Sequence, residues 1–122
     1  DIVGLASLPL ILLPRPAGSR VKLDRLAADA AVTLNVTHEV TNIDVVKDFV
    51  GRGLGYGILP YSSIAEGLAE NRYTARPIDG LTITRTLVRR SDRAPSPATV
   101  ELERLVEDEI GQMIEAGGFG NV

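Results

Sequence analysis

The chain has 122 residues, of which 44% are hydrophobic and 24% are charged, and its formal net charge is -3. This composition is typical of soluble globular chains, and the length suffices for one domain with its own core. The absence of cysteine excludes disulfides and thiolate metal sites, and the negative charge argues against a surface that grips the phosphates of nucleic acid.

The first apolar run predicts a buried strand. Residues 8–13 are continuously apolar and are closed by Pro14, as in a strand that is covered on both faces of a parallel sheet. The run is too short to span a bilayer, which takes about 20 residues, and Asp1 stands where a signal peptide has basic residues. We therefore expect a cytoplasmic protein with no membrane partner.

The next segments predict a helix and a second strand. Ser19 is a candidate N-cap for a helix that runs to about Ala31, with apolar residues recurring at i, i+3, i+4 and i+7. Residues 32–40 alternate between apolar and polar, which predicts a strand with one wetter side, near a sheet edge. His38 lies on the apolar face of that strand, so we interpret it as a packed or edge-strand histidine and not as a catalytic base.

A central helix follows, beginning at Thr41 or Asn42. Thr41 and Asp44 have the spacing of a capping box, in which the hydroxyl accepts from a free amide and the carboxylate returns the bond. The spacing of the apolar side chains predicts that one face of this helix is buried. The residues expected on that face are Ile43, Val45, Val46, Phe49 and Val50.

The glycine-rich run GRGLGYG after this helix resembles a dinucleotide-binding loop only superficially. Its glycine register does not fit G-x-G-x-x-G, and the run leaves a helix and enters a strand, whereas the fingerprint joins a strand to a helix. We interpret Gly51 or Gly53 as the left-handed residue that ends the helix, and Gly55 and Gly57 as positions of close approach. A strand is expected over 56–59.

The rest of the chain predicts a short helix, two strands, a linker and a long helix. The serine pair at 62 and 63 is a candidate cap for the short helix, and Ser96 with Pro97 forms a cap and first turn for the long one. In chain order the expected elements are the helix 64–69, the strands 73–77 and 81–88, the linker 91–97 and a helix that ends at Gly117 and Gly118.

Charge is distributed unevenly along the second half of the chain. Arginines gather between residues 72 and 93, and carboxylates crowd the last helix. We interpret these groups as solvated faces with weak surface pairs, in preference to a basic docking site.

Strands that alternate with helices predict an α/β fold with a three-layer, mainly parallel sheet. In such sheets ligands bind beyond the carboxyl ends of the strands, where helices begin. Segments 14–20, 39–43 and 60–63 are expected at that edge. The polar residues that they supply are Arg15, Ser19, Arg20, Thr41, Asn42 and the serines at 62 and 63. Capping alone explains each hydroxyl, but together these residues suit a small anion or a polar metabolite.

The sequence gives no indication of catalysis. A serine nucleophile needs a base and an orienting acid, and His38 is the single histidine. With no cysteine and one histidine, a transition-metal site would depend on carboxylates. We expect neither enzyme activity nor a cofactor nor a metal site.

The run DVVKDFVGRGLGYGILP, preceded by HEVTN and by LPLILLPRPAGSR, resembles the second lobe of the effector-binding domain of LysR-type transcriptional regulators. TITRTLVRRS resembles the return crossing between lobes, and APSPATVELERLVEDEI resembles the closing helix of the domain. The opening LPLILLPRPAGSR is also similar to the branch around the nitrogen-assimilation-control regulators.

The resemblance implies a periplasmic-binding-protein-like (type 2) lobe. Residues 1–90 would form the second lobe, and 91–122 a linker and the closing helix of the otherwise missing first lobe. The DNA-binding module of the family has no counterpart here, so we interpret the chain as a fragment. The apolar stripe of the last helix is then expected to pack elsewhere or against another copy.

The resemblance also implies a function and a site. An effector binds between the two lobes and alters how the regulator binds DNA and contacts RNA polymerase, which only the full-length protein does. The second-lobe contact of the family maps onto Thr41, Asn42 and Ile43, and Arg15 is a further candidate. Side-by-side pairing through the helix 19–31 and the strand after it implies a homo-oligomer, with dimers and, in the full-length protein, tetramers.

Two other functions remain open at this point. A lobe of a type 2 periplasmic solute-binding protein has the same architecture but serves transport. A small α/β enzyme is a further alternative, and the absence of any cluster of acid, base and nucleophile weighs against it.

Overall fold

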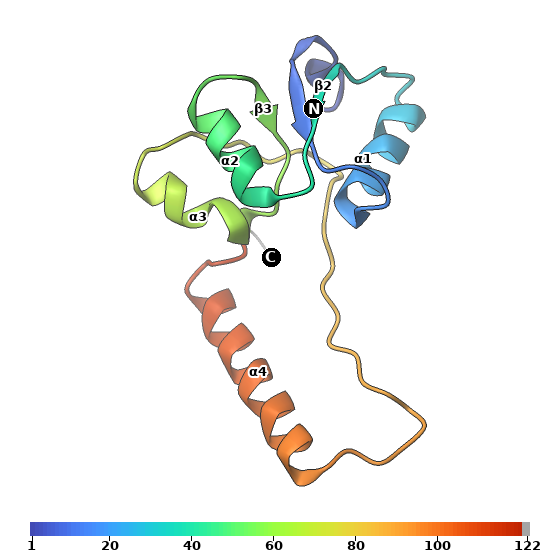
Figure 1. The fold of residues 1–122 in the computed structure, drawn as a ribbon, viewed down its shortest axis with the longest axis vertical. Helices are drawn as coiled ribbons and strands as arrows, with labels where there is room; N and C mark the ends of the chain where they lie inside the picture. The colour runs from blue at the N-terminus through green and yellow to red at the C-terminus, as the bar shows by residue number, and fades with distance from the viewer. Residues whose placement is uncertain (121–122) are drawn as a thin grey trace. The chain divides into compact units, whose positions relative to one another are not determined.

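The computed structural model describes residues 1–120, so the last two residues of the predicted segment 91–122 lie outside the described residues. The chain divides into two compact units, the first comprising Asp1–Ile83 and the second beginning at Thr84. The first unit contains every strand of the described chain (Figure 1). Its elements are η1 (Val3–Ser7), β1 (Leu10–Leu12), α1 (Gly18–Asp29), β2 (Val36–Glu39), α2 (Ile43–Gly51), β3 (Tyr56–Gly57) and α3 (Tyr61–Ala69).

The sheet is parallel and has the order β2-β1-β3. In β1, Leu10 pairs with Val36 of β2 on one side and with Tyr56 of β3 on the other. All three residues of β1 are buried, as the continuous apolar run predicted for a central strand. β2 is an edge strand, which confirms the wetter side inferred from its alternation. The predicted α/β class with a parallel sheet is therefore confirmed.

Helices cover both faces of this sheet (Figure 1). Successive side chains of a strand point to opposite faces, so Leu10 and Leu12 share one face and Ile11 occupies the other. On the first face, α1 contributes Leu23 and Ala27 to the same buried cluster as Leu10 and Leu12. On the other face, α2 packs against β1 and β3. This produces the three layers expected from the sequence.

The start of α2 is confirmed at Asn42, the second of its two predicted positions, whereas the predicted capping box and two predicted serine caps are wrong. The N-cap of α2 is Asn42, whose Oδ1 accepts from the Asp44 N–H at 2.8 Å, so Thr41 lies before the cap and forms no capping box. α1 begins at Gly18 after Ala17, which places Ser19 inside the first turn. α3 begins after Pro60, whose carbonyl accepts from Ser63 Oγ at 2.7 Å, so this hydroxyl caps no amide.

The glycine run after α2 has the structure predicted for it. Gly53 has φ +75°, a left-handed conformation that glycine adopts without steric cost, and it follows the end of the helix. A Cβ built on Gly55 would lie 2.6 Å from Pro9 O, and one on Gly57 would lie 2.8 Å from Val46 Cγ1. Both are therefore positions of close approach.

The predicted strands are too long or absent. Only 36–39 of the predicted 32–40 and 56–57 of the predicted 56–59 form ladders. The predictions of strands over 73–77 and 81–88 are wrong, because these segments form no ladder. Near the end of the first unit the chain is held by α1 instead, where Lys22 Nζ donates to Thr82 O at 2.8 Å.

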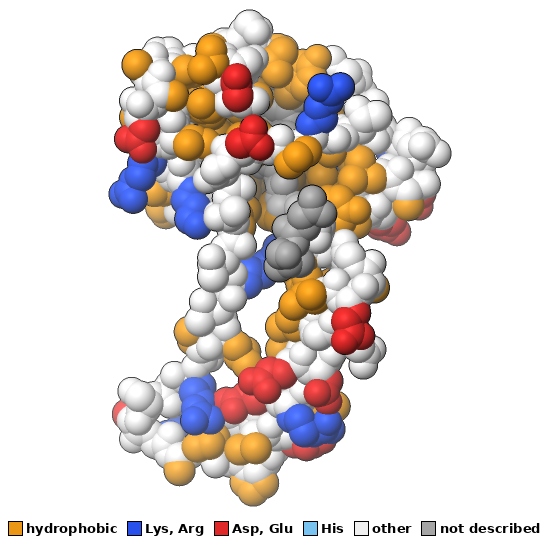
Figure 2. All heavy atoms as spheres, turned by 180° about the vertical axis from the view of Figure 1, so that it is seen from behind, with side chains coloured by type: hydrophobic (Ala, Val, Ile, Leu, Met, Phe, Trp, Pro, Cys, Tyr) orange, Lys and Arg blue, Asp and Glu red, His pale blue; other side chains and the backbone are white. Residues whose placement is uncertain are grey.

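The second unit contains α4 (Pro97–Glu115) and the segment that leads to it. Ser96 Oγ accepts from the Thr99 N–H at 3.1 Å and Gly117 has φ +74°, so both predicted ends of this helix are confirmed. Arg89 pairs with Glu103 at 3.1 Å within the unit. α4 buries no residue, and hydrophobic side chains lie among charged ones at the surface (Figure 2). Its exposed apolar residues are Val100, Leu102, Leu105, Ile110, Met113 and Ile114.

Within residues 1–120, no helix is both long and apolar enough to cross a bilayer.

Candidate functional site

The candidate site is the edge of the sheet at which β1 and β2 end. The two strands are parallel, and their pairing extends to Val40, whose N–H donates to Leu12 O at 2.9 Å. The segments that follow β1 and β2 therefore leave the sheet side by side. Arg15 lies on the first segment, and Thr41, Asn42 and Ile43 lie on the second, as the alternation of strands and helices predicted.

A buried arginine from α1 connects the two segments. Arg20 is only 7% exposed. Its Nη1 donates to Leu13 O at 3.2 Å, just beyond β1, and to Glu39 Oε1 at 2.8 Å, at the end of β2. Its Nε donates to Asp24 Oδ1 at 3.0 Å, one turn further along α1. A buried guanidinium is stable only when its buried donors are paired, and these acceptors pair its Nε and Nη1 donors.

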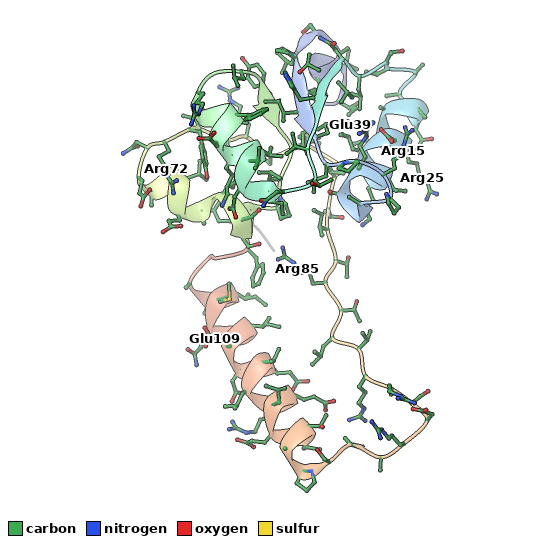
Figure 3. The ribbon with its side chains drawn as sticks, viewed as in Figure 1. Arg15, Arg25, Glu39, Arg72, Arg85 and Glu109 are labelled. Carbon is green, nitrogen blue, oxygen red and sulfur yellow. The ribbon has the colours of Figure 1, made fainter. Side chains whose placement is uncertain are left out.

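Asp24 extends this network to Arg15. The Oδ2 atom of Asp24 accepts from Arg15 Nε at 2.6 Å, while its Oδ1 atom accepts from Arg20. Arg15 is 68% exposed, so it reaches the network from the solvent side. Figure 3 shows Arg15 and Glu39 on the side of the sheet where α1 lies. The predicted contact Arg15 is thus already held by a carboxylate. We call Arg15, Arg20, Asp24 and Glu39 the edge network.

Burial and pairing act in opposite directions on the titrating groups of this network. Burial alone would raise the pKa of Asp24, but hydrogen bonds from Arg20 and Arg15 outweigh it and lower the pKa of this carboxyl below its ordinary value. Burial alone would lower the pKa of Arg20, but hydrogen bonds to Glu39 and Asp24 outweigh it and raise that pKa. Both groups are therefore held in their charged forms.

Stability should consequently depend on pH through Asp24. A carboxyl with a depressed pKa in the folded state stabilises the fold above its unfolded pKa, about 3.9, and loses this contribution as pH falls through the folded value. We expect Asp24→Asn to lower the free energy of unfolding by about 2 kcal/mol at pH 7. The difference from the wild type should shrink below about pH 3.9. Urea unfolding of both chains at neutral and acidic pH measures this.

Asp29→Asn is the matched control, since Asp29 is exposed at the end of the same helix. It should change the free energy of unfolding by no more than about 0.5 kcal/mol. A difference for Asp24→Asn that stays constant from neutral to acidic pH would contradict the ionic role of Asp24.

The residues predicted around the start of α2 differ in how accessible they are. Thr41 and Asn42 are exposed, and Ile43 is half-buried. The side chain of Asn42 is engaged as the helix cap, which leaves Thr41 as the hydroxyl at this position. The N-terminal amides of a helix have no acceptor in a preceding turn, so the start of α2 carries a partial positive charge.

A sizeable cavity lies elsewhere in the first unit. It has a volume of about 540 Å³ and lies among η1, β3, α2, α3 and the segment 73–78. None of Arg15, Thr41, Asn42 or Ile43 lines it, and its walls are mostly aliphatic and aromatic side chains. No residue of the edge network lines it either.

The acidic side chains and His38 do not gather into one cluster in the part of the chain that the structure describes. Residues 1–120 contain no group of three or more His, Asp or Glu side chains placed to hold a metal ion. His38 is exposed, and its ring meets that of Phe49 edge-on at 5.7 Å between centroids. This agrees with an edge-strand histidine.

Reasoning from the sequence placed Arg20 at this edge but missed the network that it forms with Asp24 and Glu39. The spacing of residues along α1 could have indicated this network. Arg20 precedes the buried residues Leu23 and Ala27 by three and seven positions, so it lies on the buried face of α1. An arginine on a buried face requires carboxylate or carbonyl partners, and Asp24 at i+4 is the first within reach.

Comparison with protein families identifies this fold. The family model described as the LysR substrate binding domain matches residues 2–111. Searches of curated proteins and of solved structures found no match. The matched region contains the whole candidate edge and extends through α4 as far as Gly111. The chain therefore belongs to the LysR substrate-binding domain family.

Proposed function

We propose that this domain binds a small polar or anionic metabolite between two lobes and thereby modulates DNA binding and transcription by a LysR-type regulator. The family supports an effector-sensing domain of such a regulator. The observation that carries the proposal is the polar edge at which β1 and β2 end, where exposed polar residues from two segments meet a helix start. Ligands of open parallel sheets bind at such edges.

Within this edge, Thr41 and the start of α2 are the proposed direct contacts. The Thr41 hydroxyl offers one donor and two acceptor positions, and the helix start favours negative charge by about 0.3–1 kcal/mol. Asn42 and Ile43 contribute backbone at the same point, while the Asn42 side chain holds the cap. Arg15 supplies a cation whose charge Asp24 already compensates. The edge network has two positive and two negative groups, so it favours a polar or singly charged ligand over a highly charged one.

We assign this chain to one lobe of a two-lobed receptor, together with one helix of the other lobe. We infer that residues 1–90 form the second lobe and that 91–122 form a linker and the closing helix of the first lobe. The first unit has its own core around β1, whereas α4 exposes its apolar side chains. The full-length regulator is then a cytoplasmic homo-oligomer that reaches DNA and RNA polymerase through its other parts.

Thr41→Ala tests the site. A panel of small carboxylates and polar metabolites is first screened by thermal shift with the full-length regulator, and the best stabiliser is titrated by calorimetry. We expect Thr41→Ala to weaken its binding about threefold to tenfold, because one hydrogen bond to the ligand is lost. The unfolding temperature without ligand should not change, since Thr41 is exposed and caps no helix.

Thr33→Ala is the matched control, because Thr33 is an exposed threonine that precedes β2 and lies away from this edge. It should leave the titration unchanged. Equal affinities for the wild type and Thr41→Ala would remove Thr41 from the site.

A further inference from the structure

We propose that Arg20 is a positioning residue, whose buried guanidinium sets the position of the segment carrying Arg15 relative to the segment carrying Thr41. The inference rests on the proposed effector site, because it assigns to Arg20 the role of keeping that site in shape. Arg20 itself is 7% exposed, so it acts through its neighbours and not by touching a ligand.

The contacts of Arg20 reach each part of the edge. Leu13 O belongs to the segment between β1 and Arg15, and Glu39 ends β2 two residues before Thr41. Asp24 receives one hydrogen bond from Arg20 and another from Arg15. One side chain of α1 thus contacts both exit segments. The backbones of these segments are also joined at the last rung of the ladder, where Val40 N donates to Leu12 O.

The geometry of these bonds requires arginine. Nε serves Asp24 within α1, and Nη1 serves the two acceptors at the ends of β1 and β2. The planar guanidinium holds these donors at a fixed angle, whereas the ammonium of lysine is a point charge on a flexible stem. Lysine at this position keeps the charge but cannot hold all three acceptors in the same relation.

Movement of either segment would cost Arg20 a partner. Because its burial makes an unpaired donor unfavourable, the arrangement with all acceptors in place is strongly preferred. Arg15 and Glu39 are the exposed members of the edge network. A displacement of either side chain would therefore alter the ion pairs that hold Arg20. Arg20 therefore pre-organises the edge for a ligand.

Hydrogen exchange of the full-length regulator without any ligand tests this. Arg20→Lys should accelerate exchange of the hydrogen-bonded amides at the two exits, those of Ala17, Val40 and Asp44, about tenfold, because charge-assisted bonds at both exits are weakened. The core amides of β1 should keep their protection. Arg25→Lys is the matched control: Arg25 is an exposed arginine of the same helix, on its outer side in Figure 3, and should change nothing.

Glu39→Gln separates positioning from a general loss of stability. Glu39 is 53% exposed, so this variant is expected to fold, and exchange should rise in 39–44 alone. Adding Arg20→Lys to Glu39→Gln should produce less extra exchange in 39–44 than it does in the wild type, because the two residues share one bond. Wild-type exchange at both exits in Arg20→Lys, or strictly additive effects in the double variant, would overturn the proposal.

If these exchange results hold and no metabolite of the panel binds, the positioning role stands and the proposed effector site fails. If a metabolite binds through Thr41 but exchange at both exits is indifferent to Arg20→Lys, the site stands and the positioning role fails.

Discussion

Replacing Leu23 by alanine is expected to lower the free energy of unfolding of the first unit by about 3–5 kcal/mol. Leu23 is 1% exposed and lies in the cluster that joins α1 to Leu10 and Leu12 of the central strand. The substitution removes buried apolar atoms and leaves a cavity, because β1 is fixed by ladders on both sides and cannot move to fill it. Urea unfolding followed by circular dichroism measures the loss.

Leu54→Ala is the matched control for this substitution. Leu54 is 51% exposed in the turn between α2 and β3, so the same change of side chain should cost less than about 1 kcal/mol. Equal losses for the two variants would mean that α1 does not depend on Leu23 for its packing on the sheet.

The layered arrangement was predictable because its signals are local. The apolar run closed by Pro14 specifies a covered strand, and Leu23, Leu26 and Ala27 recur at helical spacing, so both sides of the interface between β1 and α1 are encoded in short segments. The ends of α4 were equally predictable, since Ser96 followed by Pro97 is a start signal that needs no other part of the chain.

The strand predictions over 73–77 and 81–88 failed for the opposite reason. Alternating residues such as Leu81, Ile83 and Leu87 favour an extended backbone, but a strand also needs a neighbour to receive its hydrogen bonds. In the first unit, Leu81 packs against the core cluster and the carbonyl of Thr82 accepts from Lys22 of α1. This segment therefore contacts a helix, whereas its alternating pattern predicted that it would pair with a strand. Pairing is a property of two segments, and one segment cannot reveal it.

The candidate edge was predicted in outline and missed in its internal structure. Strand order places the segments with Arg15 and Thr41 together, and that follows from topology alone. The sequence left the cap of α2 open between Thr41 and Asn42 because both are good N-caps one residue apart, and only the backbone decides between them. The link from Arg20 to Glu39 joins residues 19 positions apart on different elements, which sequence spacing does not encode.

Gly55→Ala is expected to destabilise the first unit by about 3 kcal/mol, because the added Cβ would lie 2.6 Å from Pro9 O and 3.2 Å from Ile11 Cδ1. The isoleucine side chain can rotate, but Pro9 O is backbone and accepts the Tyr56 N–H at 2.9 Å, so relieving the clash breaks the bond that starts the pairing of β1 with β3. Urea unfolding should show the loss of stability, and hydrogen exchange should show it first at the amide of Tyr56.

Gly51→Ala is the control from the same run of glycines. Its Cβ would meet nothing within 4 Å at the end of α2, so it should be neutral or stabilising by up to about 1 kcal/mol. If both variants were equally stable, the close approach of β3 to Pro9 would not govern how this edge of the sheet forms.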